Sequence, residues 1–353
     1  VWVKGTDTPA TIIAVGTPEE LKDALDALSD GDTIKLTANI NYNDSITISK
    51  AVIFDVGQYT LNITATEYDY LTGLEVTGSV SLISTTGELN VTGSRIGVMV
   101  RNGEAASATV TNATVTRPDG IGIHATSIQP KTSNIVVQGN VNAPHTGVYA
   151  FGSGSSVTVH GKVNAAGVGA EAESDASIVV YGDIEAESCG VKIVSAGRII
   201  VGKDITTTGA DSIGAWVTND GTVRIDGDIT AVNYIKLGST IKLKGDGVVD
   251  PDLSGFTKYS NGNDCVVRVK GVAVPSDKVC EISGTQYATL DEALAAVQSG
   301  DRITLLKDIN YPKGIAVTGK HIIFYVGPYK LNITNSGGSG LDVSGTAGRV
   351  SLV

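Results

Sequence analysis

Short runs of alternating apolar and polar residues recur along the chain at intervals of 20 to 25 residues. Each period opens with a glycine before an apolar–x–apolar strand, as in Gly97-Val-Met-Val and Gly147-Val-Tyr-Ala. Two more short strands follow, for example Val157-x-Val159 and the strand at Val163. Alternation with a period of two is typical of a strand with one buried side. The pattern therefore predicts three short strands per period, continuing through Ile241-x-Leu243.

The order of the three strands is the same in every period, which indicates a repeat architecture. A single strand of this kind cannot bury its apolar side alone, whereas the matching strand of the next period can pair with it and continue the core. The sequence predicts an all-β fold, a right-handed parallel β-helix, with the hand taken from the usual preference of parallel crossovers. An antiparallel β-sandwich is the competing interpretation, but it does not explain the constant order.

One short amphipathic helix is expected at the N-terminal end, near residues 18–29. Thr17 fits an N-cap, Pro18 the first helical position and Glu20 the third. Apolar residues then follow on one face, from Leu21 to Leu28. Because a solenoid needs its open end covered, we expect this helix to cap the first turns.

The opening module returns near the C-terminus. GDTIKLTANINY (31–42) resembles GDRITLLKDINY (300–311), and a second helix is expected from Thr289 to Gly300. We expect a β-helix over 1–263, a hairpin-like linker over 264–284 and the start of a second β-helix over 285–353. The natural protein is expected to be longer, since the second module breaks off after a few strands.

Composition narrows the possible partners. The 353 residues carry a formal net charge of −11, which argues against a nucleic-acid partner because phosphates would be repelled. The sequence contains no apolar run of the length that a membrane span needs. Cys265 and Cys280 flank a possible hairpin; a disulfide between them and two separate thiols both fit the sequence.

The segment GTQYATLDEALAAVQSGDRITLLKDI (284–309) resembles the opening of pectate-lyase-like right-handed β-helix modules in surface proteins of Gram-positive bacteria. The resemblance covers the two module starts, about 75 residues each, and implies an exported, adhesin-like, secreted or cell-surface protein. Such proteins are often continuous with further repeats or wall-attachment domains. The resemblance is specific for the capped fold and weak for activity.

Candidate ligand-binding residues come from the outward position of the glycine-anchored strand. Stacked in order, this column is expected to begin at Glu75 and to include Gly169. Its larger side chains are expected to form a stripe that binds a polysaccharide or another cell-surface ligand. The stripe comprises Met99, His124, Tyr149, Lys192, Trp216 and Lys236. A solvated face with scattered large residues is the alternative.

A second outward column contains Asp183, Asp204 and Asp228. Carboxylates stacked at strand spacing repel one another, so a Ca²⁺ ion bound by their oxygens is one interpretation and a solvated acidic ridge the other. No other cofactor is expected. The sequons that begin at Asn62, Asn90, Asn112 and Asn332 are explained by chance in a chain rich in Asn and Thr.

No catalytic residues are predicted, because no acidic cluster with a basic partner and no zinc motif is present. The expected function is a non-catalytic, extracellular module that binds a polysaccharide or another surface through a lateral strand face. A polysaccharide lyase or glycoside hydrolase of the same fold is the main alternative. A purely structural stalk is the third.

Overall fold

The computed structural model describes residues 10–67, 71–101, 105–262, 265–271, 278–283, 285–326 and 329–352. These residues form two compact units, each with its own hydrophobic core. The first unit comprises the described residues up to 243 and those from 249 to 271. The second comprises 244–248 and the described residues from 278 onward.

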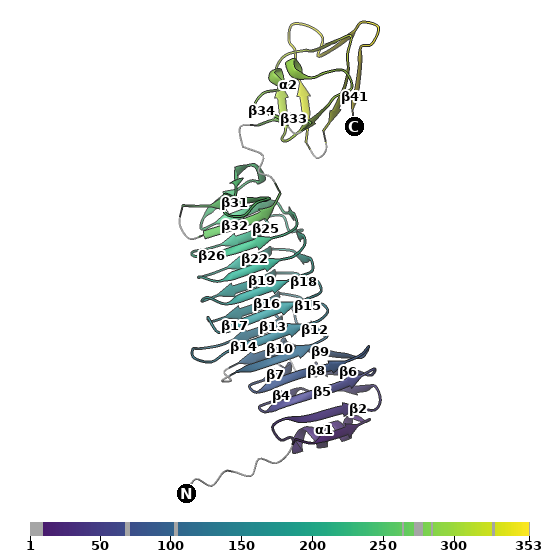
Figure 1. Cartoon of the computed structure of the whole chain (residues 1–353), viewed down its shortest axis with the longest axis vertical. Helices are drawn as coiled ribbons and strands as arrows, with labels where there is room; N and C mark the ends of the chain where they lie inside the picture. Colours follow the sequence, from purple (N-terminus) through teal and green to yellow (C-terminus); the bar gives the residue numbers. More distant parts are fainter. Residues whose placement is uncertain are drawn as a thin grey trace. The chain divides into compact units, whose positions relative to one another are not determined.

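The first unit is the predicted parallel β-helix. Three long sheets run along it, and almost every turn contributes one strand to each (Figure 1). Sheet A contains, in spatial order, β1 (Ile12–Val15), β2 (Asp32–Leu36), β5 (Ala51–Gly57), β8 (Ser79–Ser84), β11 (Ala106–Val110), β14 (Ser133–Val137), β17 (Ser155–Val159), β20 (Ser177–Val180), β23 (Arg198–Val201), β26 (Gly221–Ile225), β32 (Cys265–Lys270), β31 (Phe256–Ser260) and β30 (Val248–Val249).

The other two sheets follow the same order along the axis. Sheet B contains β3 (Ile40–Tyr42), β6 (Thr60–Ala65), β9 (Glu88–Gly93), β12 (Asn112–Val115), β15 (Val141–Ala143), β18 (Val163–Ala165), β21 (Ile184–Ala186), β24 (Ile205–Thr207) and β27 (Ile229–Thr230). Sheet C contains β4 (Ile46–Ile48), β7 (Thr72–Val76), β10 (Ile96–Arg101), β13 (Ile121–Thr126), β16 (Thr146–Phe151), β19 (Val168–Glu173), β22 (Cys189–Ile193), β25 (Ile213–Val217), β28 (Asn233–Leu237) and β29 (Thr240–Lys242).

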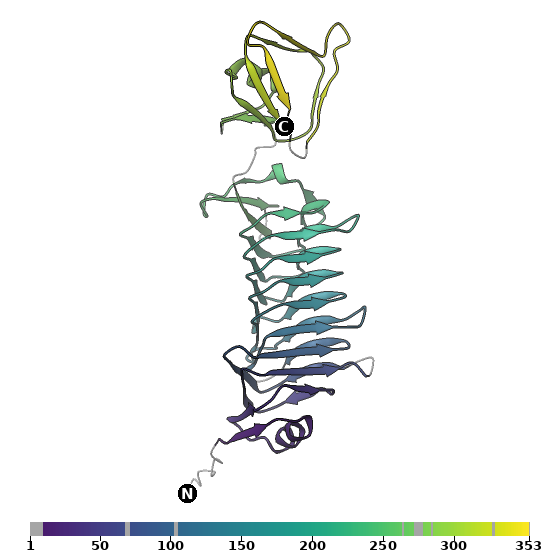
Figure 2. The ribbon, with the colours of Figure 1, turned by 90° about the vertical axis from the view of Figure 1, so that its right-hand side faces the viewer.

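Stacking of like residues builds the core. Val157, Ile178 and Ile199 lie in register on β17, β20 and β23, and all three side chains are buried. Successive turns are seen edge-on in Figure 2. Because each β-branched side chain packs on its counterpart about 4.8 Å away, the sequence needs only small apolar residues to fill the interior.

The anchoring glycines are required by a close approach between sheets B and C. A Cβ added to Gly190 would lie 2.2 Å from Cγ2 of Ile205 and 2.5 Å from the carbonyl oxygen of Gly214. A Cβ added to Gly147 would lie 2.5 Å from the carbonyl oxygen of Gly169, and one added to Gly169 would lie 2.5 Å from that of Gly190. The repeated glycine that marks each period therefore marks a corner with no room for a side chain.

The capping helix α1 (Pro18–Ala27) forms as predicted. The Thr17 side chain accepts a hydrogen bond from the backbone of Glu20 at 3.2 Å, and the Glu20 carboxylate accepts one from Gly16. Leu21 and Ala24 are buried against the first turns. The helix therefore covers apolar surface that the first turn would otherwise expose.

The second unit repeats this opening. Helix α2 (Leu290–Ala296) has the complete capping box of Thr289 and Glu292. Its sheet consists of β34 (Thr285–Tyr287), β33 (Cys280–Ile282), β35 (Arg302–Leu305), β38 (His321–Tyr325) and β41 (Arg349–Leu352). Two parallel pairs accompany it, β36 (Ile309–Tyr311) with β39 (Leu331–Ile333) and β37 (Ile315–Thr318) with β40 (Leu341–Ser344).

The end of the first β-helix differs from the sequence prediction. β29 turns back antiparallel to β28, so Ile241 and Leu243 are exposed and do not continue the repeat. The next strand of sheet A is β32, inside the predicted linker, because its alternating apolar residues pack beside β26. β32 pairs antiparallel with β31, so the hairpin lies earlier than predicted. Part of the predicted linker (264, 272–277 and 284) lies outside the described residues.

Candidate functional site

The predicted outward column on sheet C exists, with one correction. Met99, His124 and Tyr149 lie side by side on β10, β13 and β16. The next member is Glu171, not Gly169, because Ala170 pairs with Val148 and Glu171 with Tyr149. The sequence prediction slipped by two residues since Gly167-Val-Gly169 offers two equivalent glycine anchors. Gly169 is the one that stacks on the corner glycine of the next turn, since a Cβ added to it would lie 2.5 Å from the carbonyl oxygen of Gly190.

The remaining members of the column bind one another. Lys192 forms an ion pair with Glu171 at 3.1 Å, and its ammonium lies 5.5 Å from the ring centre of Trp216. The ammonium of Lys236 lies over the same ring at 4.0 Å. The indole nitrogen donates to the carbonyl oxygen of Gly238. A ring already covered by an ammonium is not free to stack on a sugar, so this column is a weaker platform than the sequence suggested.

His124 and Tyr149 are also engaged within the column. Their rings meet edge to face with centres 5.1 Å apart, and the Tyr149 hydroxyl donates to Glu173 at 3.0 Å. Burial, with a smaller contribution from the Arg101 guanidinium, lowers the pKa of His124 to about 4. Nδ1 of His124 is buried and has no hydrogen-bond partner among the described residues. His124 is therefore a neutral ring in the folded protein at physiological pH.

The acidic column on sheet B is a ladder of backbone caps. Oδ1 of Asp183 accepts from the backbone N–H of Asp204 at 3.4 Å, and Oδ1 of Asp204 accepts from that of Asp228 at 2.8 Å. Asn112 and Asn140 make the same contact earlier in the column. In the part of the chain that the structure describes, no group of three His, Cys, Asp or Glu side chains is arranged to hold a metal ion. The geometry therefore gives no support to the proposed Ca²⁺ site, because these carboxylates are turned along the ladder toward amides.

The two C-terminal cysteines do not form a disulfide. Cys265 lies in the core of the first unit and Cys280 in the core of the second, and both are buried thiols. Burial raises the pKa of Cys280 to about 11. Each thiol lies inside the core of its own unit, and Sγ of Cys265 donates to the backbone carbonyl oxygen of Asn219.

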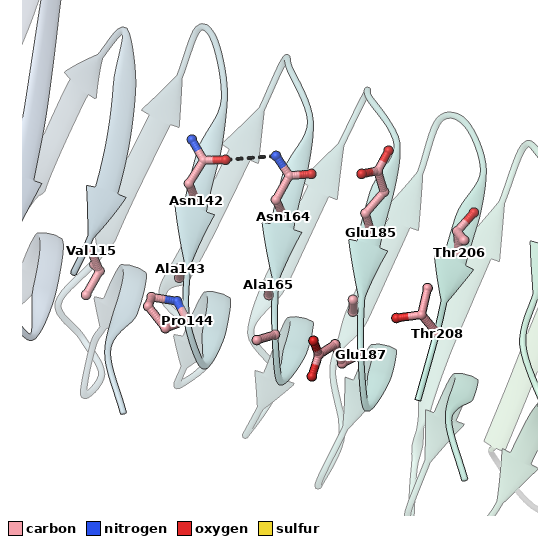
Figure 3. Close-up of a pocket in the computed structure, with 12 residues that line it drawn as sticks. Val115, Asn142, Ala143, Pro144, Asn164, Ala165, Glu185, Glu187, Thr206 and Thr208 are labelled. Carbon is pink, nitrogen blue, oxygen red and sulfur yellow. Dashed lines mark hydrogen bonds between the residues drawn. The ribbon is translucent and has the colours of Figure 1, made fainter. Parts of the chain in front are cut away.

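A groove of about 630 Å³ runs along the first unit where sheet B turns toward sheet C (Figure 3). It crosses four strands, β15, β18, β21 and β24. Its polar wall contains one side chain from each strand, all in register. From the N-terminal end, this wall consists of Asn142, Asn164, Glu185 and Thr206. Three strand spacings of about 4.8 Å give the wall a length of roughly 15 Å.

Small residues form the floor of the groove. Ala143, Ala165 and Ala186 lie in register, one position after the polar wall. The opposite wall consists of the residues that follow the strands, which are Pro144, Ala166, Glu187 and Thr208. A mostly apolar lining with a few hydrogen-bonding side chains, here the polar wall with Glu187 and Thr208 opposite it, is the usual composition of a ligand site.

The polar wall is partly organised before any ligand binds. The amide of Asn164 donates to Oδ1 of Asn142 at 2.8 Å, the one hydrogen bond drawn in Figure 3. Oδ1 of Asn164 has no partner among the described residues, although it is buried. Glu185 is exposed and pairs with Lys162 at 3.0 Å. The wall therefore offers amide and carboxylate groups, and one buried acceptor oxygen is unsatisfied.

The sequence prediction missed this groove. The available signal was the repeated strand Val-Asn-Ala at 141–143 and 163–165, followed by Ile-Glu-Ala at 184–186. A polar residue beside an alanine in three successive periods predicts a row of polar side chains next to a row of small apolar ones. Strand patterns alone do not reveal a groove, because its second wall comes from the turns.

No family model, no curated protein and no solved structure matches the chain. The resemblance noted in the sequence is therefore supported only as far as the β-helix itself. Neither helix in the described part of the chain has the length and apolar character needed to cross a bilayer.

Proposed function

We propose that this chain is an extracellular, adhesin-like β-helix module that binds a linear polysaccharide in the axial groove without cleaving it. The observation that carries the proposal is the repetition along the groove. Three successive turns present a hydrogen-bonding side chain beside an alanine, so the surface has the same periodic character as an extended sugar chain. Hydroxyl groups would meet the amides and carboxylates, and the C–H faces of the sugar would lie on the alanines.

Charge favours a neutral glycan for this groove. Glu185 and Glu187 both line it, and the whole chain carries a net charge of −11. A polyanionic chain would be repelled by these carboxylates and by the overall charge. Secretion and attachment to a bacterial surface rest on the family resemblance and are part of the same proposal.

The test is retention on a polysaccharide array, followed by titration with soluble oligosaccharides of the retained glycan. Ala166 is exposed in the groove, so Ala166→Trp should obstruct it without entering the core, and we expect at least about a tenfold loss of affinity. Thr158→Ala, on the outer face of sheet A, is the matched control and should bind normally. Retention that survives Ala166→Trp but is lost in Trp216→Ala or Tyr149→Ala would move the site to the column on sheet C.

A second candidate function, glycan hydrolysis, rests on the two carboxylates that share the groove. Glycoside hydrolases use a pair of carboxylates on either side of the scissile bond. New reducing ends that disappear in Glu185→Gln and Glu187→Gln would establish hydrolysis, and unsaturated uronates would indicate a lyase. A glycan screen with neither retention nor product would leave the structural stalk as the function.

A further inference from the structure

A second pocket lies on the outer face of sheet A, away from the groove described above. It has a volume of about 390 Å³ and lies where β23, β26 and β32 meet the segment before β31. Three of its lining side chains are arginines, which is unusual on a chain of strongly negative net charge. The pocket is lined by Arg198, Thr222, Arg224, Asp252, Leu253 and Arg268.

Strand register forces these guanidinium groups together. Arg224 on β26 and Arg268 on β32 are direct neighbours on parallel strands. Arg198 on β23 is the direct neighbour of Thr222 on β26. Like charges directly opposite on adjacent strands repel each other. Such an arrangement is stable only if negative charge lies close by, and the chain itself supplies part of that charge.

Two of the arginines are held in fixed positions. Asp226 receives two hydrogen bonds from Arg224, at 2.7 and 3.2 Å, and the guanidinium lies 5.0 Å from the ring centre of Phe256. The carboxylate of Asp250, which is fully buried, binds Nε of Arg268. A guanidinium has five N–H donors, so both arginines retain donors that these carboxylates do not use.

The third arginine has no such partner. Arg198 is exposed and forms no ion pair with any residue that the structure describes. Among the described residues that line the pocket, Asp252 is the one with an acidic side chain. Its carboxylate is mostly exposed and lies 3.8 Å from Arg268 and 3.6 Å from Lys258, distances at which the ion pairs are loose.

We propose that this pocket binds one oxyanion group, a carboxylate, sulfate or phosphate, carried by a small anionic ligand. Guanidinium groups match the geometry of these anions with paired hydrogen bonds. Arg224 and Arg268 form the fixed part of the site, the hydroxyl of Thr222 lies beside them, and Arg198 closes on the ligand. Asp252 competes with the anion for Arg268.

The test uses the full chain with inorganic sulfate, inorganic phosphate and glucuronate as probes, and glucose as the neutral control. Binding is followed by ¹⁵N–¹H spectra of the arginine Nε groups. We expect saturable shifts with at least one anion and none with glucose. The order of the three affinities distinguishes a tetrahedral anion from a saccharide carboxylate.

Three variants decide whether the binding belongs to this pocket. Arg198→Gln should weaken it about tenfold, which corresponds to about 1.4 kcal/mol, and Asp252→Asn should strengthen it severalfold. Arg101→Gln, at the ion pair with Glu75 on sheet C, should leave it unchanged. Absence of anion binding, or equal binding by wild type and Arg198→Gln, would overturn the proposal. So would weaker binding by Asp252→Asn.

Discussion

At the scale of single residues, the outward face is more ordered than an alternating pattern suggests. Outward side chains of neighbouring turns bind one another, as Lys192 and Trp216 do on sheet C. The sequence showed which residues share a column but not that they satisfy one another. Whether a stacked side chain turns toward solvent or toward its neighbour depends on the neighbour's chemistry and on its rotamer. The alternation of apolar and polar residues gives no information about either.

His124 should make stability depend on pH. Its pKa falls from 6.5 to about 4 on folding, because burial and Arg101 disfavour the charged ring. The stabilisation that the neutral ring provides is present above pH 6.5 and is lost as the pH falls toward 4, by up to about 3 kcal/mol. Tyr149 and Arg101 are the ionisable groups that face the ring.

Urea unfolding between pH 7 and pH 4 checks this, with His124→Gln as the variant. Carboxylates also lose stabilising contacts in acid, so the comparison between wild type and variant isolates the histidine. We expect the variant to lose less stability over this range, whereas His160→Gln, an exposed control, should follow the wild type. Parallel curves for wild type and His124→Gln would contradict the assignment.

At the scale of elements, asparagine ladders join the strands of sheet B. Side-chain amides connect Asn41, Asn62, Asn90 and Asn112 at distances of 2.8 to 3.0 Å. Asn310 and Asn332 repeat this contact at 2.9 Å in the second unit. The four sequons thus contain ladder residues. Each asparagine is followed two positions later by a threonine because both face outward, so a structural pattern explains them better than chance.

Replacing Asn90 by Asp should destabilise the first unit by about 1–2 kcal/mol. The amide of Asn90 donates to both Asn62 and Glu88, and a carboxylate cannot donate and would repel Glu88. Asn134→Asp is the matched control, because Oδ1 of Asn134 accepts from Ser156 and an aspartate keeps that role. Thermal or urea unfolding of both variants gives the comparison. Equal losses in the two would show that charge, not the lost donor, is responsible.

The strand order was predictable from the sequence because a parallel stack repeats its inward residues. The register at β19 was not, since two glycines two residues apart fit the same pattern, and only the corner contact with Gly147 and Gly190 decides between them. The groove was not predictable either. Its polar row and floor are in the strands, but its other wall, including Pro144 and Thr208, depends on how the turns fold back.

At the scale of the whole molecule, the chain has two cores that share no residues. Each unit has its own N-capped helix near its start, α1 or α2, followed by parallel strands. Because each unit has its own hydrophobic core, we expect the units to unfold in separate steps.

Calorimetry of two single variants checks this. Val159→Asp places a charge in the first core and Ile303→Asp places one in the second, and both side chains are fully buried in the wild type. Each change should cost several kcal/mol and lower one transition only. Thr158→Ser, an outward neighbour of Val159, should change stability by less than about 0.5 kcal/mol. A single transition that both aspartate variants lower together would show that the units unfold as one.

The alanine floor of the groove ends abruptly. Val115 occupies the position before Ala143, and Thr207 follows Ala186. These two positions end the row of alanines, so under the proposed function the count of alanine-bearing turns sets a preferred oligomer size. Addition or removal of one complete turn would then lengthen or shorten the preferred oligosaccharide correspondingly. The number of turns in the β-helix would thus determine the length of glycan that binds best.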